Sequence, residues 1–194
     1  MGRPKSYDQQ QVLKKAMMQF WQAGFAETSL SDLETATSLN RYSLYKGFGD
    51  KEALFEMALE YYQQHIISRM LAPLIQSPPT LKVLTDYFQH LNELLKGKYG
   101  KFGCLFQNSQ KERISQNKLV KKYTTQLWLQ QIDLFRACLR DEKCQLPFAE
   151  DHAIQLLLAQ NQSQISLARA EVPARVLDAQ CQAILALITS WTVK

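Results

Sequence analysis

The chain has 194 residues, of which 46% are hydrophobic and 21% charged, and its formal net charge is +5. This composition is typical of a folded protein and excludes a disordered or collagen-like chain. The longest apolar run, residues 183–188, is far shorter than the roughly 20 residues that cross a bilayer, and residues 1–20 show no export signal. We therefore expect a cytoplasmic protein without a membrane partner.

Residue patterns that mark enzymes and metal sites are missing from the sequence. The four cysteines contain no CxxC pair, and a protein without an export signal normally keeps its thiols reduced. None of the three histidines lies beside a Gly-rich or nucleophile-elbow motif, and no P-loop or paired-carboxylate spacing occurs. We expect no disulfide, no metal site, no cofactor and no enzymatic activity.

The first part of the chain is predicted to form four helices. Apolar residues recur every three or four positions from Val12 to Trp21, which is the spacing of one buried helix face. Asp8 is of a type that caps helix N-termini, and Gly24 suits a helix end. Similar start signals occur at Thr28 or Ser29, at Asn40 and at Asp50. The predicted helices cover residues 8–24, 29–38, 40–47 and 50–72.

A proline-rich connector at residues 73–79 separates these helices from longer ones. Pro73 is expected to end the fourth helix because proline does not continue a helix. Two more helices follow a glycine-rich passage, and no convincing β-alternation appears, so the expected fold class is all-α. The helices after the connector are predicted over residues 80–96, 105–114 and 115–139.

The last two predicted helices each carry an apolar seam with alternating spacings of four and three residues. Such heptad-like seams favour helices that pack at a shallow angle. Asn161 lies within the first seam, where it either fixes the register of two helices or faces solvent. The seams consist of Ile154, Leu158, Asn161, Ile165 and Ala168, and of Leu177, Cys181, Ile184, Ile188 and Trp191.

The two short helices at residues 29–38 and 40–47 indicate a helix-turn-helix, whose second helix enters the DNA major groove. Asn40 serves either as a helix cap or as a base contact. Arg3 and Lys5 form either a basic arm that reaches DNA or a solvated terminus. Donors for guanine and phosphate, and an aromatic surface for thymine, come from Arg41, Tyr42, Ser43, Tyr45 and Lys46.

Three blocks of this region resemble the tetracycline-repressor (TetR) family. They read TSLSDL at 28–33, LNRYSLY at 39–45 and FGDKEAL at 48–54. Three positions depart from the family's pattern: Ser38 stands where a turn glycine is usual, Gly47 where a larger residue is common, and Gly49 where proline is frequent. Ser38 is expected to strain the turn, and Gly47 to weaken the helix by about 1 kcal/mol.

The resemblance implies a bacterial, homodimeric, ligand-responsive transcriptional regulator, usually a repressor. Such a dimer binds palindromic double-stranded DNA, associates with the nucleoid when bound, and is released by a small-molecule effector. The DNA-binding domain is expected at residues 1–50, with a connecting helix at 51–72. Residues 73–194 are expected to bind the effector and to dimerise.

The resemblance also implies residue roles. Thr28, Tyr45 and Lys51 are expected to contact phosphates, whereas Arg41, Tyr42 and Lys46 are expected to read bases. The final two helices are expected to form the dimer interface, which their seams support. The interface residues are then Ile154, Leu158, Asn161, Ile165, Leu177, Cys181, Ile184, Ile188 and Trp191.

The effector pocket is expected among aromatic and polar residues of the central helices, with ordinary core packing as the alternative for each. Cys104 is either a buried inert thiol or, with a pKa lowered by nearby Lys101, a redox or electrophile sensor. A small thiol peroxidase-like enzyme using Cys104 is a further alternative. The pocket candidates are Phe88, Leu91, Phe102, Cys104, Phe106, Gln107, Asn108, Leu127, Trp128, Gln131 and Phe135.

Overall fold

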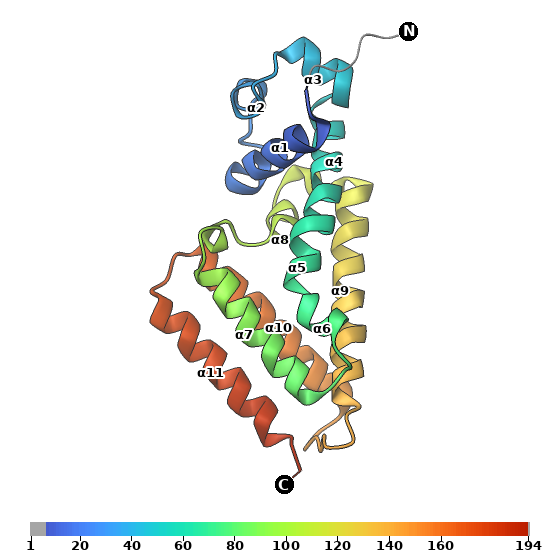
Figure 1. The fold of residues 1–194 in the computed structure, drawn as a ribbon, viewed down its shortest axis with the longest axis vertical. Helices are drawn as coiled ribbons and strands as arrows, with labels where there is room; N and C mark the ends of the chain where they lie inside the picture. The colour runs from blue at the N-terminus through green and yellow to red at the C-terminus, as the bar shows by residue number, and fades with distance from the viewer. Residues whose placement is uncertain (1–6, 194) are drawn as a thin grey trace. The chain divides into compact units, whose positions relative to one another are not determined.

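A computed structural model describes residues 7–193 as helices joined by short loops (Figure 1). Among these residues there is no strand, only a single bridge between Cys144 and Thr192. The predicted all-α fold class is confirmed. The chain divides into two compact units: unit 1 comprises Met1–Ile66 and Cys104–Thr124, and unit 2 comprises Ile67–Gly103 and Thr125–Lys194.

Unit 1 contains the predicted N-terminal helices. Their starts are confirmed by capping hydrogen bonds: Asp50 accepts from the backbone N–H of Ala53 at 2.8 Å, and Ser29 and Asp32 form a reciprocal capping box. The helices are α1 (Gln9–Ala23), α2 (Leu30–Thr37), α3 (Arg41–Phe48), α4 (Lys51–Tyr62), α8 (Leu105–Ser109), the 3-10 turn η3 (Arg113–Gln116) and the first part of α9 (Lys118–Leu139).

An aromatic core holds unit 1 together. The ring centroids of Phe20 on α1 and Phe55 on α4 lie 4.9 Å apart. Tyr62 packs edge-on against Trp21 at 5.0 Å and against Phe106 of α8 at 5.2 Å. Because α8 supplies part of this core, residues 104–124 fold with the N-terminal helices. The compact units therefore do not divide at residues 72 and 73, where the sequence analysis placed its domain boundary.

Several helix boundaries differ from the prediction. The chain does not continue as one α-helix from residue 50 to Pro73, because α4 passes into a π-helical turn, η1 (Gln63–Ile67). Pro73 starts a helix instead of ending one: it lies in the first turn of α6 (Ala72–Gln76), where a missing N–H is tolerated. Likewise, the helix predicted over residues 105–114 stops at Ser109. The next predicted helix, α9, starts at Lys118 and not at residue 115, and the Asn117 side chain caps it by accepting from the N–H of Leu119.

Unit 2 is built around α7 (Leu81–Lys96). This helix packs against α6, α10 (Glu150–Arg169) and α11 (Ala174–Ser190), as Figure 1 shows for the last two. Thr80 caps α7 by accepting from the N–H of Val83 at 3.2 Å. The unit also contains α5 (Ser68–Met70), the 3-10 turn η2 (Gly100–Phe102) and the remainder of α9.

The predicted dimer-interface residues belong to the core of unit 2, which corrects their assignment. Their side chains are all buried within the single chain; Ile188, for example, is 0% exposed. Because α7 already covers these seams, the side chains are not available to a second copy. The residues reassigned from the dimer interface to the core are Ile154, Leu158, Asn161, Ile165, Leu177, Cys181, Ile184, Ile188 and Trp191.

Candidate nucleic-acid interface

The α2–turn–α3 segment has helix-turn-helix geometry. Ser38 ends α2 in the left-handed region, with φ of 61°, and this is the turn strain expected where a glycine is more usual. The Glu34 carboxylate of α2 accepts a hydrogen bond from the backbone N–H of Arg41, the first residue of α3. The start of α3 is therefore fixed to α2 by a side chain as well as by the turn.

Asn40 acts as the helix cap of α3. Its side-chain oxygen accepts from the backbone N–H of Ser43 at 2.9 Å. This bond satisfies one of the N–H groups that a helix start leaves unpaired. Asn40 is thus engaged in the cap, one of the two roles considered for it.

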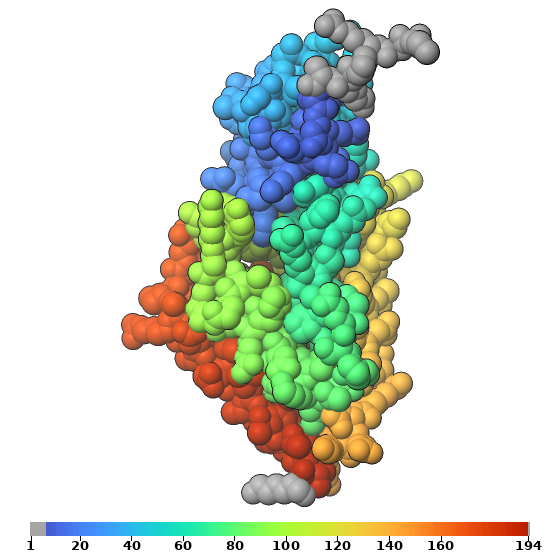
Figure 2. Space-filling view, viewed as in Figure 1, coloured from blue at the N-terminus to red at the C-terminus, as the bar shows by residue number. Residues whose placement is uncertain are grey.

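The outer face of α3 is basic and aromatic. Leu44 and Phe48 are buried, whereas the Tyr42 side chain is 72% exposed. Figure 2 shows the α2 and α3 segments, in light blue, on the outside of unit 1. Two cations lie over aromatic rings of the same helix: Arg41 over Tyr45 at 5.5 Å and Lys46 over Tyr42 at 5.7 Å. No acidic side chain occurs within α3.

Two glycines that depart from the family pattern have structural reasons. A Cβ at Gly47 would clash with the Tyr7 hydroxyl, so a larger residue fits there only if the Tyr7 side chain moves. Gly49 ends α3 with φ of 82°, a conformation that proline is unable to adopt. Both departures are therefore accommodated by the local packing of unit 1.

Two of the expected phosphate contacts are engaged within unit 1. Thr28 is 0% exposed, and its hydroxyl donates to the carbonyl of Gly24 at 2.6 Å. This burial contradicts the role expected for Thr28. The Lys51 ammonium lies 4.5 Å from the centroid of the Phe25 ring, and burial lowers the pKa of Lys51. Arg3 and Lys5 lie outside the described residues.

Glu112 ties the α8–η3 segment to the loop that precedes α2. Its carboxylate accepts from the backbone N–H of Phe25 at 3.3 Å and of Ala26 at 2.7 Å. A Cβ at Gly24 would come within 2.8 Å of the same carboxylate, and Gly24 has φ of 91°. The sequence does not predict this contact, because Gly24 is the one residue there that hints at a close approach to the backbone.

Asn117 makes a second tie within unit 1. Its side-chain nitrogen donates to Glu52 at 2.6 Å and to Glu56 at 2.8 Å on α4. Its side-chain oxygen caps α9. The segment from α8 to the start of α9 is therefore joined to α4 by Asn117, and to the loop before α2 by Glu112.

The predicted effector-pocket residues do not all come together in one unit. Phe106 belongs to the core of unit 1, where its ring also stacks on Tyr123 at 5.7 Å. Cys104, Phe106, Gln107 and Asn108 lie in unit 1, whereas Phe88, Leu91, Phe102, Leu127, Trp128, Gln131 and Phe135 lie in unit 2.

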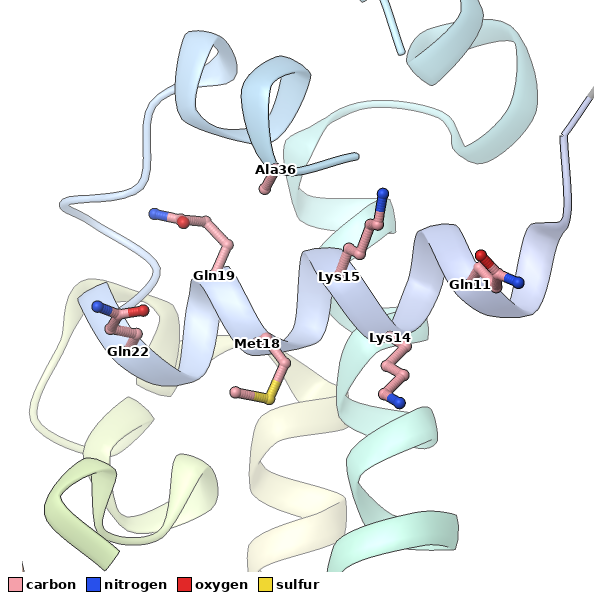
Figure 3. A pocket seen from close by; sticks show the side chains of 7 residues that line it. All are labelled: Gln11, Lys14, Lys15, Met18, Gln19, Gln22 and Ala36. Atoms are coloured by element: carbon pink, nitrogen blue, oxygen red, sulfur yellow. The ribbon is translucent and has the colours of Figure 1, made fainter. Parts of the chain in front are cut away.

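A surface hollow of about 510 Å³ lies between α1 and α2 (Figure 3). It is lined by Gln11, Lys14, Lys15, Met18, Gln19, Gln22 and Ala36. These side chains are mostly polar and lie at the surface, unlike the enclosed, largely apolar sites typical of small-molecule ligands. None of the pocket residues predicted from the sequence lines this hollow.

Cys104 is buried, and burial raises the pKa of its thiol despite hydrogen bonds that act in the opposite direction. Of the two alternatives for Cys104, the buried thiol therefore agrees with the structure, and the sensor or peroxidase with a pKa lowered by Lys101 is not favoured. A raised pKa leaves less of the reactive thiolate at neutral pH.

We expect iodoacetamide to modify Cys104 in the native protein roughly tenfold or more slowly than the partly exposed Cys144. Mass spectrometry of timed samples measures both rates in one experiment. Both reactions should accelerate as the pH rises, because burial raises the pKa of both thiols. Equal rates at the two cysteines would contradict the burial of Cys104.

The described residues hold neither a cluster of metal-ligating side chains nor a helix suited to cross a membrane. No group of three or more His, Cys, Asp or Glu side chains lies close enough to hold a metal ion there. In the same part of the chain, none of the helices combines the length and apolar character that a membrane span needs.

Comparisons with known proteins agree with this geometry. Residues 12–58 match the family model described as bacterial regulatory proteins, tetR family. The chain is 31% identical over 170 residues to the HTH-type regulator YezE of Bacillus subtilis, which covers 86% of this chain and 87% of YezE. The chain belongs to the TetR family. It is also 36% identical over 109 residues to the repressor ComR of Escherichia coli, spanning 56% of this chain but only 52% of ComR.

Solved structures share the fold of this TetR-family protein. One is a cysteine mutant of the regulator CifR in complex with 26-base-pair operator DNA, with a TM-score of 0.80 and 24% identity; the match covers 95% of this chain and 98% of CifR. Another is a TetR regulator from Chloroflexus aurantiacus, with a TM-score of 0.81, 20% identity and 93% coverage of both chains. At these identities the likeness supports the fold alone, and it confirms the arrangement of a helix-turn-helix followed by a helical C-terminal part.

Proposed function

We propose that this TetR-family protein is a homodimeric transcriptional repressor that binds a palindromic operator and is released by a small-molecule effector. The observation that carries the proposal is the exposed basic and aromatic face of α3, fixed to α2 by Glu34. CifR, a structural neighbour, was solved on double-stranded operator DNA, and ComR is described as a repressor. We infer action in the bacterial cytoplasm, at the nucleoid when DNA-bound, and no enzymatic role.

The proposed DNA contacts divide into two kinds. Arg41 and Tyr42, at the exposed start of α3, read base edges in the major groove, with Lys46 one turn further on. Ser43, Tyr45 and Lys51 bind phosphates, and Lys51 has to leave the Phe25 ring to do so. Arg3 and Lys5 are proposed as a basic arm ahead of α1.

The proposed dimer uses the outward faces of α10 and α11, opposite to the buried seams. Leu156 on α10 is 46% exposed, and Ala159 is exposed one turn later. Ala179 and Ala183 are exposed on α11, where small side chains allow close helix approach. Gln180 on α11 accepts from Gln160 on α10 at 3.1 Å through its backbone carbonyl, which holds the two helices together. A two-fold dimer presents two α3 helices, hence a palindromic operator.

Replacing Arg41 by alanine should weaken specific operator binding by about 1 to 3 kcal/mol and reduce discrimination against random DNA. Arg41 is exposed, so the fold should be unaffected. Fluorescence anisotropy with a palindrome from upstream of the protein's own gene measures this, with a salt titration to count phosphate contacts. Arg140→Ala, an exposed arginine of unit 2, is the matched control. Unchanged discrimination in the Arg41 variant would count against α3 as the base-reading helix.

A further inference from the structure

Unit 2 contains a chain of buried hydrogen bonds that joins three helices. The side-chain nitrogen of Gln131 on α9 donates to the Tyr87 hydroxyl on α7 at 3.3 Å. That hydroxyl donates to the side-chain oxygen of Asn161 on α10 at 2.7 Å. All three side chains are at most 5% exposed. Three uncharged polar groups thus meet in the interior, where apolar residues would fill the space with less desolvation.

Gln164 lies one turn after Asn161 on the same helix and is 0% exposed. Residues three positions apart occupy one helix face, so both amides point into the unit. Within the described part of the chain, neither the oxygen nor the nitrogen of the Gln164 amide has a hydrogen-bond partner. Buried polar groups of native proteins are nearly always paired, so an unpaired amide at this position requires an explanation.

Two aromatic rings pack beside Tyr87, the middle member of the polar chain. The ring centroids of Phe88 and Phe135 lie 5.2 Å and 5.6 Å from that of Tyr87, and 6.1 Å from each other. No charged side chain is fully buried anywhere in the described residues. A charged ligand entering this interior would lose its hydration without gaining an opposite charge, whereas an uncharged ligand with an aromatic body would not.

We propose that Gln164 and the Tyr87–Asn161–Gln131 chain form the recognition site for an uncharged effector that carries an amide or lactam on an apolar ring. The amide of the ligand offers one donor and one acceptor, the complement of the Gln164 side chain. The ring of the ligand packs against the three aromatic side chains. This assignment rests on the proposed function, because it names the effector class of the proposed repressor.

Occupation of this site links the ligand to the packing of unit 2. The hydrogen-bond chain connects α7, α9 and α10, so a ligand that inserts beside Gln164 has to change the spacing of these helices. Packed interiors accept an added group only by moving to another arrangement. The effector therefore favours a state of unit 2 in which α7 and α10 lie differently.

The first test needs no ligand. Gln164→Met keeps the length of the side chain but removes the unpaired amide, so we expect the Tm of the full chain to rise by about 2 to 4 °C. Gln155→Met, at an exposed position of the same helix, is the matched control and should leave the Tm unchanged. A lower Tm for Gln164→Met would show that the amide stabilises the fold, and would overturn the proposal.

The second test uses small probes and the full chain without DNA. Ligand-observed NMR titrations compare benzamide and 2-piperidone with benzoate, benzylamine and toluene. We expect the two amides to bind in the millimolar range, and their binding to weaken at least tenfold in Gln164→Met but not in Gln155→Met. No binding of either amide, equal binding of benzoate, or equal binding by Gln164→Met would each overturn the site.

Operator binding separates this inference from the function on which it rests. If the amides fail to bind while the protein still recognises its operator, the effector site is wrong and the repressor proposal stands. If the amides bind as expected while no operator is recognised, the site is supported as a ligand site and the repressor proposal fails.

Discussion

Glutamate at position 184 should destabilise unit 2 severely, whereas glutamate at the neighbouring position 183 should yield a folded monomer. Ile184 is 4% exposed on α11, in the seam covered by α7, so Ile184→Glu buries an unpaired carboxylate. We expect a loss of at least about 4 kcal/mol in the free energy of unfolding. Ala183 is exposed on the proposed dimer face, where a carboxylate remains hydrated in the monomer but meets its own symmetry mate in the dimer.

Circular dichroism during thermal unfolding measures stability, and light scattering measures the mass in solution. Gln89→Glu adds the same charge at an exposed position of α7, outside the proposed interface, and it should change neither quantity. An Ile184→Glu variant that unfolds like the unmodified protein would contradict the burial of the seam. A dimeric Ala183→Glu variant would place the interface elsewhere.

The monomeric variant also tests the DNA proposal. A monomer presents one α3 helix, so it retains half of the contacts that a palindromic operator offers. Operator affinity should therefore fall steeply for Ala183→Glu, while binding to a single half-site should not change. Anisotropy with full and half operators compares the two. Equal loss on both would indicate damage to α3 itself.

The sequence predicted the helix-turn-helix well because local signals determine it. Ser29, Asn40 and Asp50 cap their helices in the structure, as the sequence pattern indicated. The family resemblance was confirmed for the same region. These features depend on residues a few positions apart, which the sequence displays directly.

The seams show where such reasoning fails. A period of four and three residues identifies the apolar face of a helix, but it does not say which element covers that face. In α10 and α11 the cover is α7 of the same chain, so Ile184 and Ile188 became core residues. The outward faces, with Ala159 and Ala183, carry no strong apolar period and were overlooked.

The sequence also does not predict contacts between residues that lie far apart in the chain. Gln164 reads as a polar residue of an ordinary helix, and only the structure shows that it is buried and unpaired. The sequence leaves Cys104 open between a buried inert thiol and a sensor, and only the structure shows that the thiol is buried, which raises its pKa. The sequence predicts that Pro73 ends a helix, whereas Pro73 lies in the first turn of α6. In each case the surrounding structure decides, and sequence spacing does not report it.

Removing the Glu112 carboxylate should lower both the stability of unit 1 and its affinity for operator DNA. Glu112 accepts from two backbone N–H groups, those of Phe25 and Ala26, in the loop that leads into α2. Hydrogen bonds to a charged acceptor contribute about 1.5 to 3 kcal/mol each when shielded, and both of these are partly open to water. We therefore expect Glu112→Ala to lower the free energy of unfolding by about 2 to 3 kcal/mol in total.

The effect on DNA binding has a specific sign. Loss of a negative charge by itself strengthens attraction to phosphates, so a purely electrostatic role of Glu112 predicts tighter operator binding in Glu112→Ala. A positioning role predicts weaker binding, because the loop before α2 has to be ordered again when α3 docks. Glu27→Gln removes a charge from the same loop without touching these hydrogen bonds, and it measures the electrostatic part alone. Weaker binding by Glu112→Ala together with unchanged or tighter binding by Glu27→Gln would establish that Glu112 positions the helix-turn-helix for DNA binding. Tighter binding by both variants would show that Glu112 acts on DNA binding only through its charge.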